Sequence, residues 1–453
     1  MSKREIDPQS LLQFVLETAK SHGATSADAL FVSGHSNEVR VRLSETEQVK
    51  QSRSKGVGLR VLIGQRTATT SSSDLSRQSL ANLIERTCVA ARVSAEDPTA
   101  GLPDAALFEE TAETDLDLYD GSLDSISSER GIEMALECEA AAMSADPRIR
   151  NSEGAEMGWG VSETHLANSF GTYRTTRRGS VSFWTTPVAE HEGAMERDFW
   201  YTSARHFSDL ETPSEVGRIA AARTLRRLGA TKPKTCKVPV IFEAPVACRL
   251  LGALAGAVVG GAVYRKASYL SGKLGETVAP SFVSIVDNPL IPRGSGSKTF
   301  DGEGLATRPT TVVEKGVLKS YLLDCYSARK LGMTTTRNAT RGLAGTPSAS
   351  STNFWMEPGS LSLEELIAAT PRGLLVTELI GFGINTVTGD YSQGASGVWI
   401  EDGALTEPVS EFTIASTLPE MWTNIDALGN DRDPRRAVSA PSFRIGEMTV
   451  AGQ

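Results

Sequence analysis

The sequence of 453 residues predicts an α+β protein of two domains. N-terminal helices accompany an antiparallel β-meander, and a β-rich C-terminal domain opens with a helix of small residues. Apolar residues recur at helical spacing near the N-terminus, alternate with polar residues over 29–70, and are interrupted by a run with Gly and Pro at 229–237. A chain of this length is also too long for one ordinary core. We therefore place the domains at 1–232 and 235–453.

The first domain is expected to begin with a helix. Asp7 is a suitable cap and Gly23 a suitable stop, and between them lies one apolar face made of Leu11, Leu12, Val15, Leu16 and Ala19. Further helices are expected at 74–91 with Asp74 as the cap, at 123–143 and at 213–228. Strands are expected to resume near Arg148, because 159–200 is rich in Thr, Ser and aromatic residues with alternating polarity.

The second domain is expected to start with a strand at 238–242 and a buried helix over 247–263. Gly252, Gly256 and Gly260 recur every four residues in this helix, a spacing that predicts close approach of another backbone. Arg249 interrupts the apolar run, which is much shorter than the roughly 20 residues that a bilayer requires. We therefore expect no membrane span. Beyond Tyr269 the sequence predicts strands and loops with one helix at 363–369.

Composition narrows the choice of partners and compartment. A formal charge of -9 and a pI near 5.3 argue against nucleic acid as a partner, since phosphate binding needs an excess of Lys and Arg. The N-terminus lacks the apolar segment and cleavage site of a signal peptide, so a cytoplasmic location is expected. The five cysteines are scattered without CxxC spacing, which indicates reduced thiols.

Several short motifs bear on whether the chain has a nucleotide, calcium or acid–base site. The stretch 292–299 has the wrong glycine spacing for a phosphate-binding loop, and 430–435 lacks the glycine of a calcium loop. Asp301 and Glu303 flank Gly302, an arrangement that suits either acid–base work or a tight turn. All five histidines precede residue 210, so the second half of the chain contains no imidazole.

Motifs spread over nearly the whole chain resemble the TldD/PmbA family, a group that includes bacterial and archaeal peptidase subunits. The first domain contributes 56–64, Arg66, Thr67 and a Ser-Asp-Leu-Ser run that ends at Ser76. The second contributes Arg265 and Lys266 together with 300–304, 327–332, 376–381, 385–395 and 442–452. The last three stretches resemble the PmbA branch.

The resemblance implies a zinc site in peptidase members that this chain lacks. Those members carry His-Glu-x-x-x-His on a helix before the Arg-Lys pair, with two imidazoles for zinc and a Glu that activates water. Here Gly252, Ala253 and Ala257 occupy these three positions. The family's third ligand is a Cys in the loop that corresponds to 429–441, which contains none. We expect no metal and no cofactor in this chain.

The resemblance further implies a non-catalytic PmbA/TldE-type subunit of a heterodimeric TldD-like metallopeptidase, active on unfolded or modified peptides. The expected partners are a TldD-like subunit, which would hold the zinc, and a peptide; a homodimer of the chain alone stays open. Arg265, Lys266, Asp390 and Tyr391 are expected to face substrate or partner. Two alternatives remain: a stand-alone peptidase that uses carboxylates such as Asp301, Glu303 or Asp390 or an unrecognised metal site, and a regulatory protein that binds gyrase or toxin–antitoxin partners.

Overall fold

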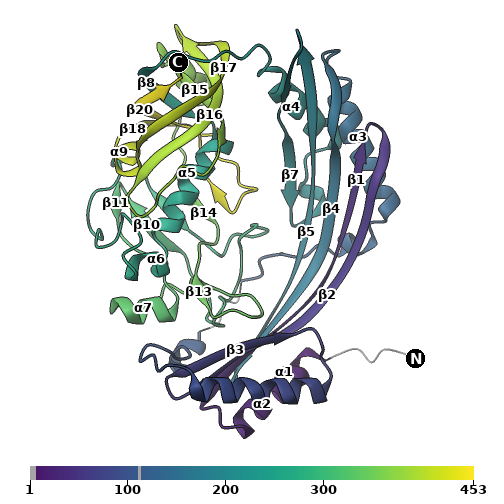
Figure 1. Ribbon diagram of the computed structural model, residues 1–453, viewed down its shortest axis with the longest axis vertical. Helices are drawn as coiled ribbons and strands as arrows, with labels where there is room; N and C mark the ends of the chain where they lie inside the picture. The colour runs from purple at the N-terminus through teal and green to yellow at the C-terminus, as the bar shows by residue number, and fades with distance from the viewer. Residues whose placement is uncertain (1–6, 111–113, 453) are drawn as a thin grey trace.

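The computed structural model describes residues 7–110 and 114–452. The first half of the chain forms one long sheet with helices on its outer face, and the second half forms a separate β-rich body beside it (Figure 1). This arrangement confirms the α+β class. The chain passes from one half to the other between Leu225 and Cys236, and the division into two domains stays a prediction. The expectation of a missing signal peptide rests partly on residues 1–6, which lie outside the described residues.

The long sheet contains the predicted meander and continues beyond it. Its strand order is β3-β2-β1-β4-β5-β6, with β7 also paired to β5, and every pairing is antiparallel. The strands are β1 (Ser26–Arg42), β2 (Glu45–Ile63), β3 (Arg66–Ser72), β4 (Ile149–Asn168), β5 (Tyr173–His191), β6 (Ala194–Arg197) and β7 (Trp200–Ala204). The strand predictions for 29–70 and for the region after Arg148 are therefore confirmed.

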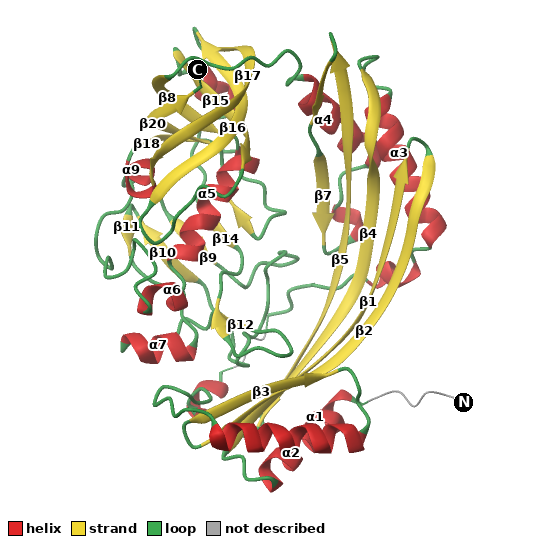
Figure 2. Cartoon of the chain, viewed as in Figure 1, coloured by secondary structure: helices red, strands yellow, loops and turns green. Residues whose placement is uncertain are grey.

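Four helices pack on one face of this sheet: α1 (Pro8–Ser21), α2 (Arg77–Val93), α3 (Ser128–Met143) and α4 (Pro213–Leu225). Helix α3 lies on the side away from the second half, and α4 lies at the edge nearest to it (Figure 2). The first pair packs on one end of the sheet, where Leu12 and Ile84 share a core with Leu59. The second pair packs further along, where Met134 and Val216 bury Trp159. In the part of the chain that the structure describes, no α-helix of the first half packs on the opposite face of the sheet.

Two helix starts differ from the prediction. The helix expected from Asp74 begins at Arg77, because the Asp74 carboxylate accepts a hydrogen bond from the Ser76 N–H at 3.0 Å and forms a turn before the helix. The helix expected from Leu123 begins at Ser128 and is capped by Ser127. A separate 3₁₀ turn, η2 (Gly121–Ser125), holds Leu123. The cap at Asp7 is confirmed.

The second half is built around a closed ring of strands. The order is β17-β16-β15-β8-β20-β18, and an extra pairing of β17 with β20 closes the five strands from β17 to β20. The strands are β8 (Cys236–Phe242), β15 (Arg372–Ile380), β16 (Asp390–Glu401), β17 (Ala404–Thr417), β18 (Ile425–Leu428) and β20 (Phe443–Ala451). Phe242, Phe443 and Trp422 fill the core beside this sheet.

Smaller elements complete the second half. A five-stranded sheet has the order β11-β10-β9-β14-β19, and β12 pairs with β13. These strands are β9 (Ile285–Asp287), β10 (Thr310–Glu314), β11 (Val317–Leu318), β12 (Ala339–Thr340), β13 (Ser348–Ala349), β14 (Phe354–Met356) and β19 (Val438–Ser439). The predicted helix near 363–369 is α8 (Leu363–Ala368), whereas the short helices α7 (Cys325–Leu331) and α9 (Leu418–Thr423) were not predicted.

The helix expected over 247–263 is two helices, α5 (Ala244–Ala257) and α6 (Gly260–Tyr264). Val259 is extended between them and pairs with Leu322. Close packing occurs at only one of the three glycines, and it is against side chains and not against another backbone: a Cβ atom on Gly260 would lie 2.1 Å from Ser327 Oγ. A Cβ atom on Gly252 or Gly256 would meet nothing within 4 Å, so the prediction was wrong for these two.

Among residues 7–110 and 114–452, no helix combines the length and the apolar character needed to cross a lipid bilayer.

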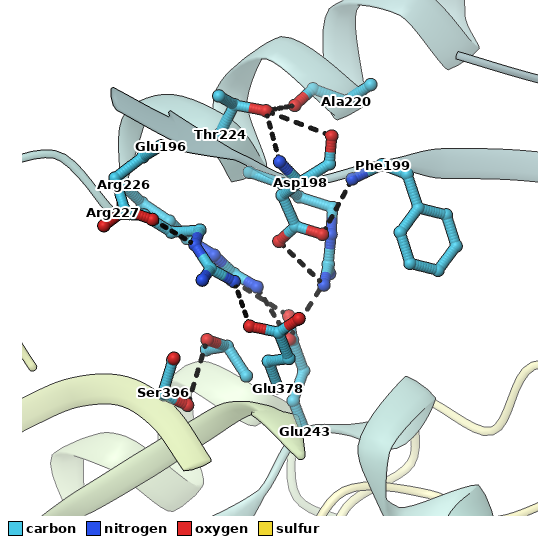
Figure 3. A network of polar contacts seen from close by, with 12 residues as sticks. Glu196, Asp198, Phe199, Ala220, Thr224, Arg226, Arg227, Glu243, Glu378 and Ser396 are labelled. Atoms are coloured by element: carbon cyan, nitrogen blue, oxygen red, sulfur yellow. Dashed lines mark hydrogen bonds and ion pairs between the residues drawn. The ribbon is translucent and has the colours of Figure 1, made fainter. Parts of the chain in front are cut away.

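Ion pairs join the two halves near the chain crossover (Figure 3). Arg226 donates two hydrogen bonds to Glu243, at 3.1 and 2.8 Å. Arg223 bridges Glu243 and Asp198, and Arg227 bridges Glu196 of β6 and Glu378 of β15. Burial raises the pKa of Glu243, but the two arginines outweigh it and hold that pKa below its usual value. These contacts fix α4 against the start of α5.

A second joint lies at the other end of the long sheet. Asp28 of β1 accepts hydrogen bonds from Arg60 of β2 and from Arg341, which follows β12 in the second half. The side chains of Asp28 and Arg341 are only 2% and 1% exposed. Leu30, Leu166 and Phe300 form an apolar cluster beside them. The two halves are thus fastened at both ends of the sheet.

The two packing environments of Gly256 and Gly260 predict opposite responses to alanine. Gly260→Ala is expected to lower the free energy of unfolding by about 1–3 kcal/mol, because its Cβ overlaps Ser327. Gly256→Ala is the matched control and is expected to be neutral or stabilising by up to about 1 kcal/mol, since alanine is the better helix former. Thermal unfolding of both variants measures the difference, and equal effects would contradict this packing.

Candidate functional site

The inner face of the long sheet and the part of the second half opposite it form the candidate site. One hollow of about 460 Å³ lies between Ser203, Arg205 and Asp209 of the first half and Arg293, Ser295 and Arg435 of the second. Another, of about 430 Å³, runs over the inner face of β1, β2, β4 and β5. Ser180 and Arg205 line both. The two hollows therefore adjoin each other.

The inner face is polar because side chains alternate across a strand. On β5, Val181 and Phe183 are buried under the outer helices, so Ser180 and Ser182 point to the inner side. On β4, Trp159 is buried in the same way between Gly158 and Gly160. The register places Ser52, Ser36, Gly160 and Ser180 in one row across four strands. The result is a surface of hydroxyl groups and exposed backbone.

A loop from the second half reaches across to β7. The guanidinium groups of Arg435 and Arg436 lie 5.4 and 4.9 Å from the ring centres of Trp200 and Tyr201. Arg435 also forms ion pairs with Glu211 and with Asp433. Such cation–π contacts position the loop over aromatic side chains of the first half. This loop is the stretch 429–441 in which the family resemblance implies a zinc ligand.

Helix α5 carries the other positions at which the resemblance implies zinc chemistry. Gly252 and Ala253 are half-buried and Ala257 is buried, and none of the three has a side-chain N, O or S atom. The loop 429–441 has no Cys to add. Among residues 7–110 and 114–452, no three His, Cys, Asp or Glu side chains are grouped to hold a metal ion. The residues at these positions do not fit a zinc ion.

The four residues expected to face substrate or partner differ in their exposure. Arg265 and Lys266 are exposed at the end of α6, where Arg265 lies over the Tyr264 ring at 5.4 Å. Asp390 is exposed and accepts a hydrogen bond from Thr388. Tyr391 is 1% exposed in the core of the second half, which rules it out as a surface contact in this structure. For the other three the expected role stays a prediction.

Asp301 and Glu303 are buried, each 2% exposed, and neither lines either hollow. The Asp301 carboxylate accepts backbone N–H groups of Glu303, Leu305 and Ala339, which is the pattern of a tight turn. Glu303 accepts the Cys325 N–H at 2.9 Å. Burial, and then the nearby Asp301 charge, raise the pKa of Glu303 to about 7. Of the two interpretations, the geometry favours the turn.

Comparison with known proteins places the chain in a family. Three models of the PmbA/TldA metallopeptidase match it: domain 1 at 27–91, the central domain at 121–228 and the C-terminal domain at 235–452. The chain belongs to the PmbA/TldD family. It is 40% identical to metalloprotease PmbA of Escherichia coli O157:H7, over 92% of this chain and 90% of that protein. It is 35% identical to a metalloprotease PmbA homologue of Haemophilus influenzae, over 100% of this chain and 98% of that protein.

Relatives on the TldD side and solved structures agree with this placement. A metalloprotease TldD homologue of Haemophilus influenzae is 25% identical over 88% of this chain and 87% of its own. A crystal structure of a proposed modulator of DNA gyrase from Bacteroides thetaiotaomicron has a TM-score of 0.91 at 29% identity, covering 98% of this chain and 99% of its own. TldE of Thermococcus kodakarensis shares the fold, with a TM-score of 0.87 at 20% identity, over 98% of this chain and all of its own. The chain is thus a peptidase-like PmbA/TldD protein.

Sequence reasoning did not find the inner-face residues as a site. Arg178 and Arg205, in particular, line the second hollow but stand outside every motif considered. The alternation of Ser180 and Ser182 with Val181 and Phe183 was visible and predicted a strand. It could not show that the polar side faces the second half.

The absence of ligating atoms at Gly252, Ala253 and Ala257 predicts that the purified chain holds no stoichiometric zinc. Metal analysis after exchange into zinc-containing buffer and removal of excess metal tests this. A zinc-loaded TldD-type protein handled in parallel serves as the positive control. About one tightly held zinc per chain would contradict the prediction.

The raised pKa of Glu303 predicts a pH-dependent stability. The folded chain binds this proton more tightly than the unfolded chain, whose glutamate titrates near 4.5, so the free energy of unfolding falls as pH rises from 4.5 to about 7. Glu303→Gln retains an acceptor for the Cys325 N–H and should flatten this fall. Melting temperatures across this range measure the effect, with Glu407→Gln at an exposed glutamate as the control. A wild-type slope that persists in Glu303→Gln would contradict it.

Proposed function

We propose that this chain is the non-catalytic subunit of a heterodimeric peptidase whose zinc site lies in a TldD-like partner. The observation that carries the proposal is that the family's fold is present, while the positions of the zinc ligands and the general base hold residues that cannot bind zinc or move a proton. All three family domains match, whereas Gly252, Ala253 and Ala257 stand where the resemblance implies ligands and a base. A chain that had lost its function altogether would be expected to lose the family's fold as well as the zinc-binding residues.

Several features support a role in binding peptide or partner. The strand-addition mode of peptide recognition needs an unpaired strand edge. In β2 the residues 45–55 pair with β1 on one side, and β3 covers the other side only from Val57 onward. Residues 45–55 are also all exposed. This edge could accept a strand from another chain, and the polar inner face lies on the same sheet.

The relatives support the existence of two kinds of subunit. Haemophilus influenzae has both a PmbA homologue and a TldD homologue, and this chain is similar to each over most of its length. The greater similarity is to the PmbA homologue, at 35% against 25% identity. We propose unfolded or modified peptides as the substrates of the assembled enzyme.

Two other functions compete with this proposal. A regulatory role is suggested by the crystal structures described as proposed modulators of DNA gyrase. A stand-alone peptidase would need its own acid–base residues, and Asp301 and Glu303 are both buried with their carboxylates engaged by backbone N–H groups. Asp390 is exposed but stands apart from that pair. The two-subunit enzyme accounts for more of the observations.

We expect peptide hydrolysis to appear only when this chain is mixed with a TldD-type subunit that carries His-Glu-x-x-x-His. The reason is that the zinc and the general base are then supplied by the partner. Cleavage of an unfolded peptide is measured for each chain alone and for the mixture. Hydrolysis by this chain alone at the rate of the mixture would disprove the proposal.

The partner's motif glutamate provides the control. Its substitution by glutamine should abolish cleavage by the mixture while leaving complex formation, followed by size-exclusion chromatography, unchanged. Asp390→Ala in this chain tests whether that exposed residue meets substrate or partner. Full activity with the glutamine-substituted partner would show that the base lies elsewhere.

A further inference from the structure

Two half-buried arginine side chains of the inner face lack an acidic partner among the described residues. Arg178 lies on β5, and Arg205 follows directly after β7. Among the described residues, neither forms an ion pair, and Arg178 donates no hydrogen bond at all. Arg205 donates to two carbonyl groups, of Gly179 at 2.8 Å and of Ser295 in the second half. Uncompensated positive charge therefore faces the hollow.

This arrangement is costly for the chain by itself. Burying a charge without a partner of opposite sign is unfavourable, so it is rare unless a ligand supplies that partner. Burial lowers the pKa of Arg178, and burial together with the Arg178 charge lowers the pKa of Arg205 to about 10. The Nε atoms of both side chains are buried without a hydrogen-bond acceptor. Both guanidinium groups lack a negative group close to them.

The charges around the hollow do not cancel this excess. Glu38 is the acidic residue of its lining, and it lies two rows of the sheet away from Arg178: the register sets Glu38 opposite Gly158, and Arg178 opposite Ser162. Lys298 of the second half lies close enough to Arg178 for their charges to interact. Burial lowers the pKa of Lys298, and the Arg178 charge lowers it further. Asp301 offsets Lys298. The hollow thus presents positive charge at one end.

We propose that Arg178 and Arg205 bind the C-terminal carboxylate of a peptide lying on the inner face of the long sheet. A guanidinium group matches a carboxylate in shape and can donate two parallel hydrogen bonds to it. The adjoining surface of Ser36, Ser180 and Gly160 offers hydroxyl groups and backbone rather than bulky side chains. Such a surface suits the main chain of a peptide and is indifferent to its sequence.

This inference rests on the proposed function, because it takes peptide as the ligand of the space between the halves. It adds an end-specific requirement: peptides with a free C-terminus should bind better than amidated ones. Arg205 would also link the ligand to the second half, since it already contacts Ser295. Arg178 is the cleaner residue to alter because no described contact depends on it.

The experiment measures binding of labelled hexapeptides to the full chain by fluorescence anisotropy. Three peptides of alanine and glycine are compared: a free acid, its C-terminal amide, and an amide with an internal glutamate. The free acid is expected to bind about tenfold more tightly than either amide, the factor expected for one charge-assisted hydrogen bond. Equal binding of acid and amide, or no binding of the acid, would overturn the proposal.

Variants identify the residues responsible. Arg178→Gln should remove the preference for the free acid, so that acid and amide bind equally. Arg177→Gln is the matched control: it removes one positive charge from the next position of β5, where the side chain pairs with Asp124 and Glu163. This control should retain the preference. Loss of the preference in both variants would point to general electrostatics and would overturn the assignment.

Stability gives a second readout that a purely structural role would not produce. Because Arg178→Gln removes a half-buried charge that has no acidic partner, its melting temperature should equal or exceed that of the wild type. A clear fall would mean that Arg178 serves the fold. Binding of the internal-glutamate amide as tightly as the free acid would reject the C-terminus as the ligand. Since none of these measurements uses catalysis, their failure is separable from failure of the two-subunit proposal.

Discussion

Arginine–carboxylate contacts at the two ends of the long sheet determine how the halves of this protein face each other. At one end Arg226 and Arg223 bind Glu243, the residue just before α5. At the other, Asp28 is held between Arg60 and Arg341. Buried ion pairs often contribute little net stability, because removing the charges from water costs about as much as their attraction returns. Their value here is geometric, since charge-assisted hydrogen bonds from a planar guanidinium group have a strong directional preference, and the Arg226–Glu243 contact is bidentate.

That geometry creates the candidate site. The helices pack on the outer face of the long sheet, so its inner face remains uncovered and polar, and the second half lies opposite it (Figure 1). The loop carrying Arg435 and Arg436 crosses to the aromatic side chains of β7. The hollow between Arg205 and Arg435 depends on this placement, because its lining comes from both halves, whereas the hollow over the inner face is lined by first-half residues alone. A shift at either joint would alter the space between Ser180 and the second half.

Helix α5 is held in place by apolar packing, with no ligating side chain at residues 252, 253 or 257. The buried side of α5 is held by Leu250, Leu251 and Leu254, which belong to the main core of the second half. Gly252 and Gly256 lie on the more open side, where an added Cβ would meet nothing. Of the three positions at which the resemblance implies zinc chemistry, Gly252 and Ala253 are half-buried, whereas Ala257 is buried in the core.

The sequence by itself determined the α+β class, the meander, most helices and the family, because these depend on local periodicity and on motifs that are continuous in the chain. It also determined that no zinc ligand stands at 252, 253 or 257, since that needs only residue identity. Its errors over α5 and α6 came from contacts between distant segments. The break at Val259 is set by pairing with Leu322, and the packing of Gly260 by Ser327.

Only the tertiary structure decided which residues share a surface. Tyr391 and Asp390 are neighbours in the chain, yet one is in the core and the other is exposed, because successive side chains of a strand point in opposite directions. Arg178 and Arg205 are ordinary residues in the sequence. Their lack of acidic partners can be recognised only when the tertiary structure gives the positions of the surrounding acidic residues. Charge compensation is a property of three-dimensional proximity, and no local pattern encodes it.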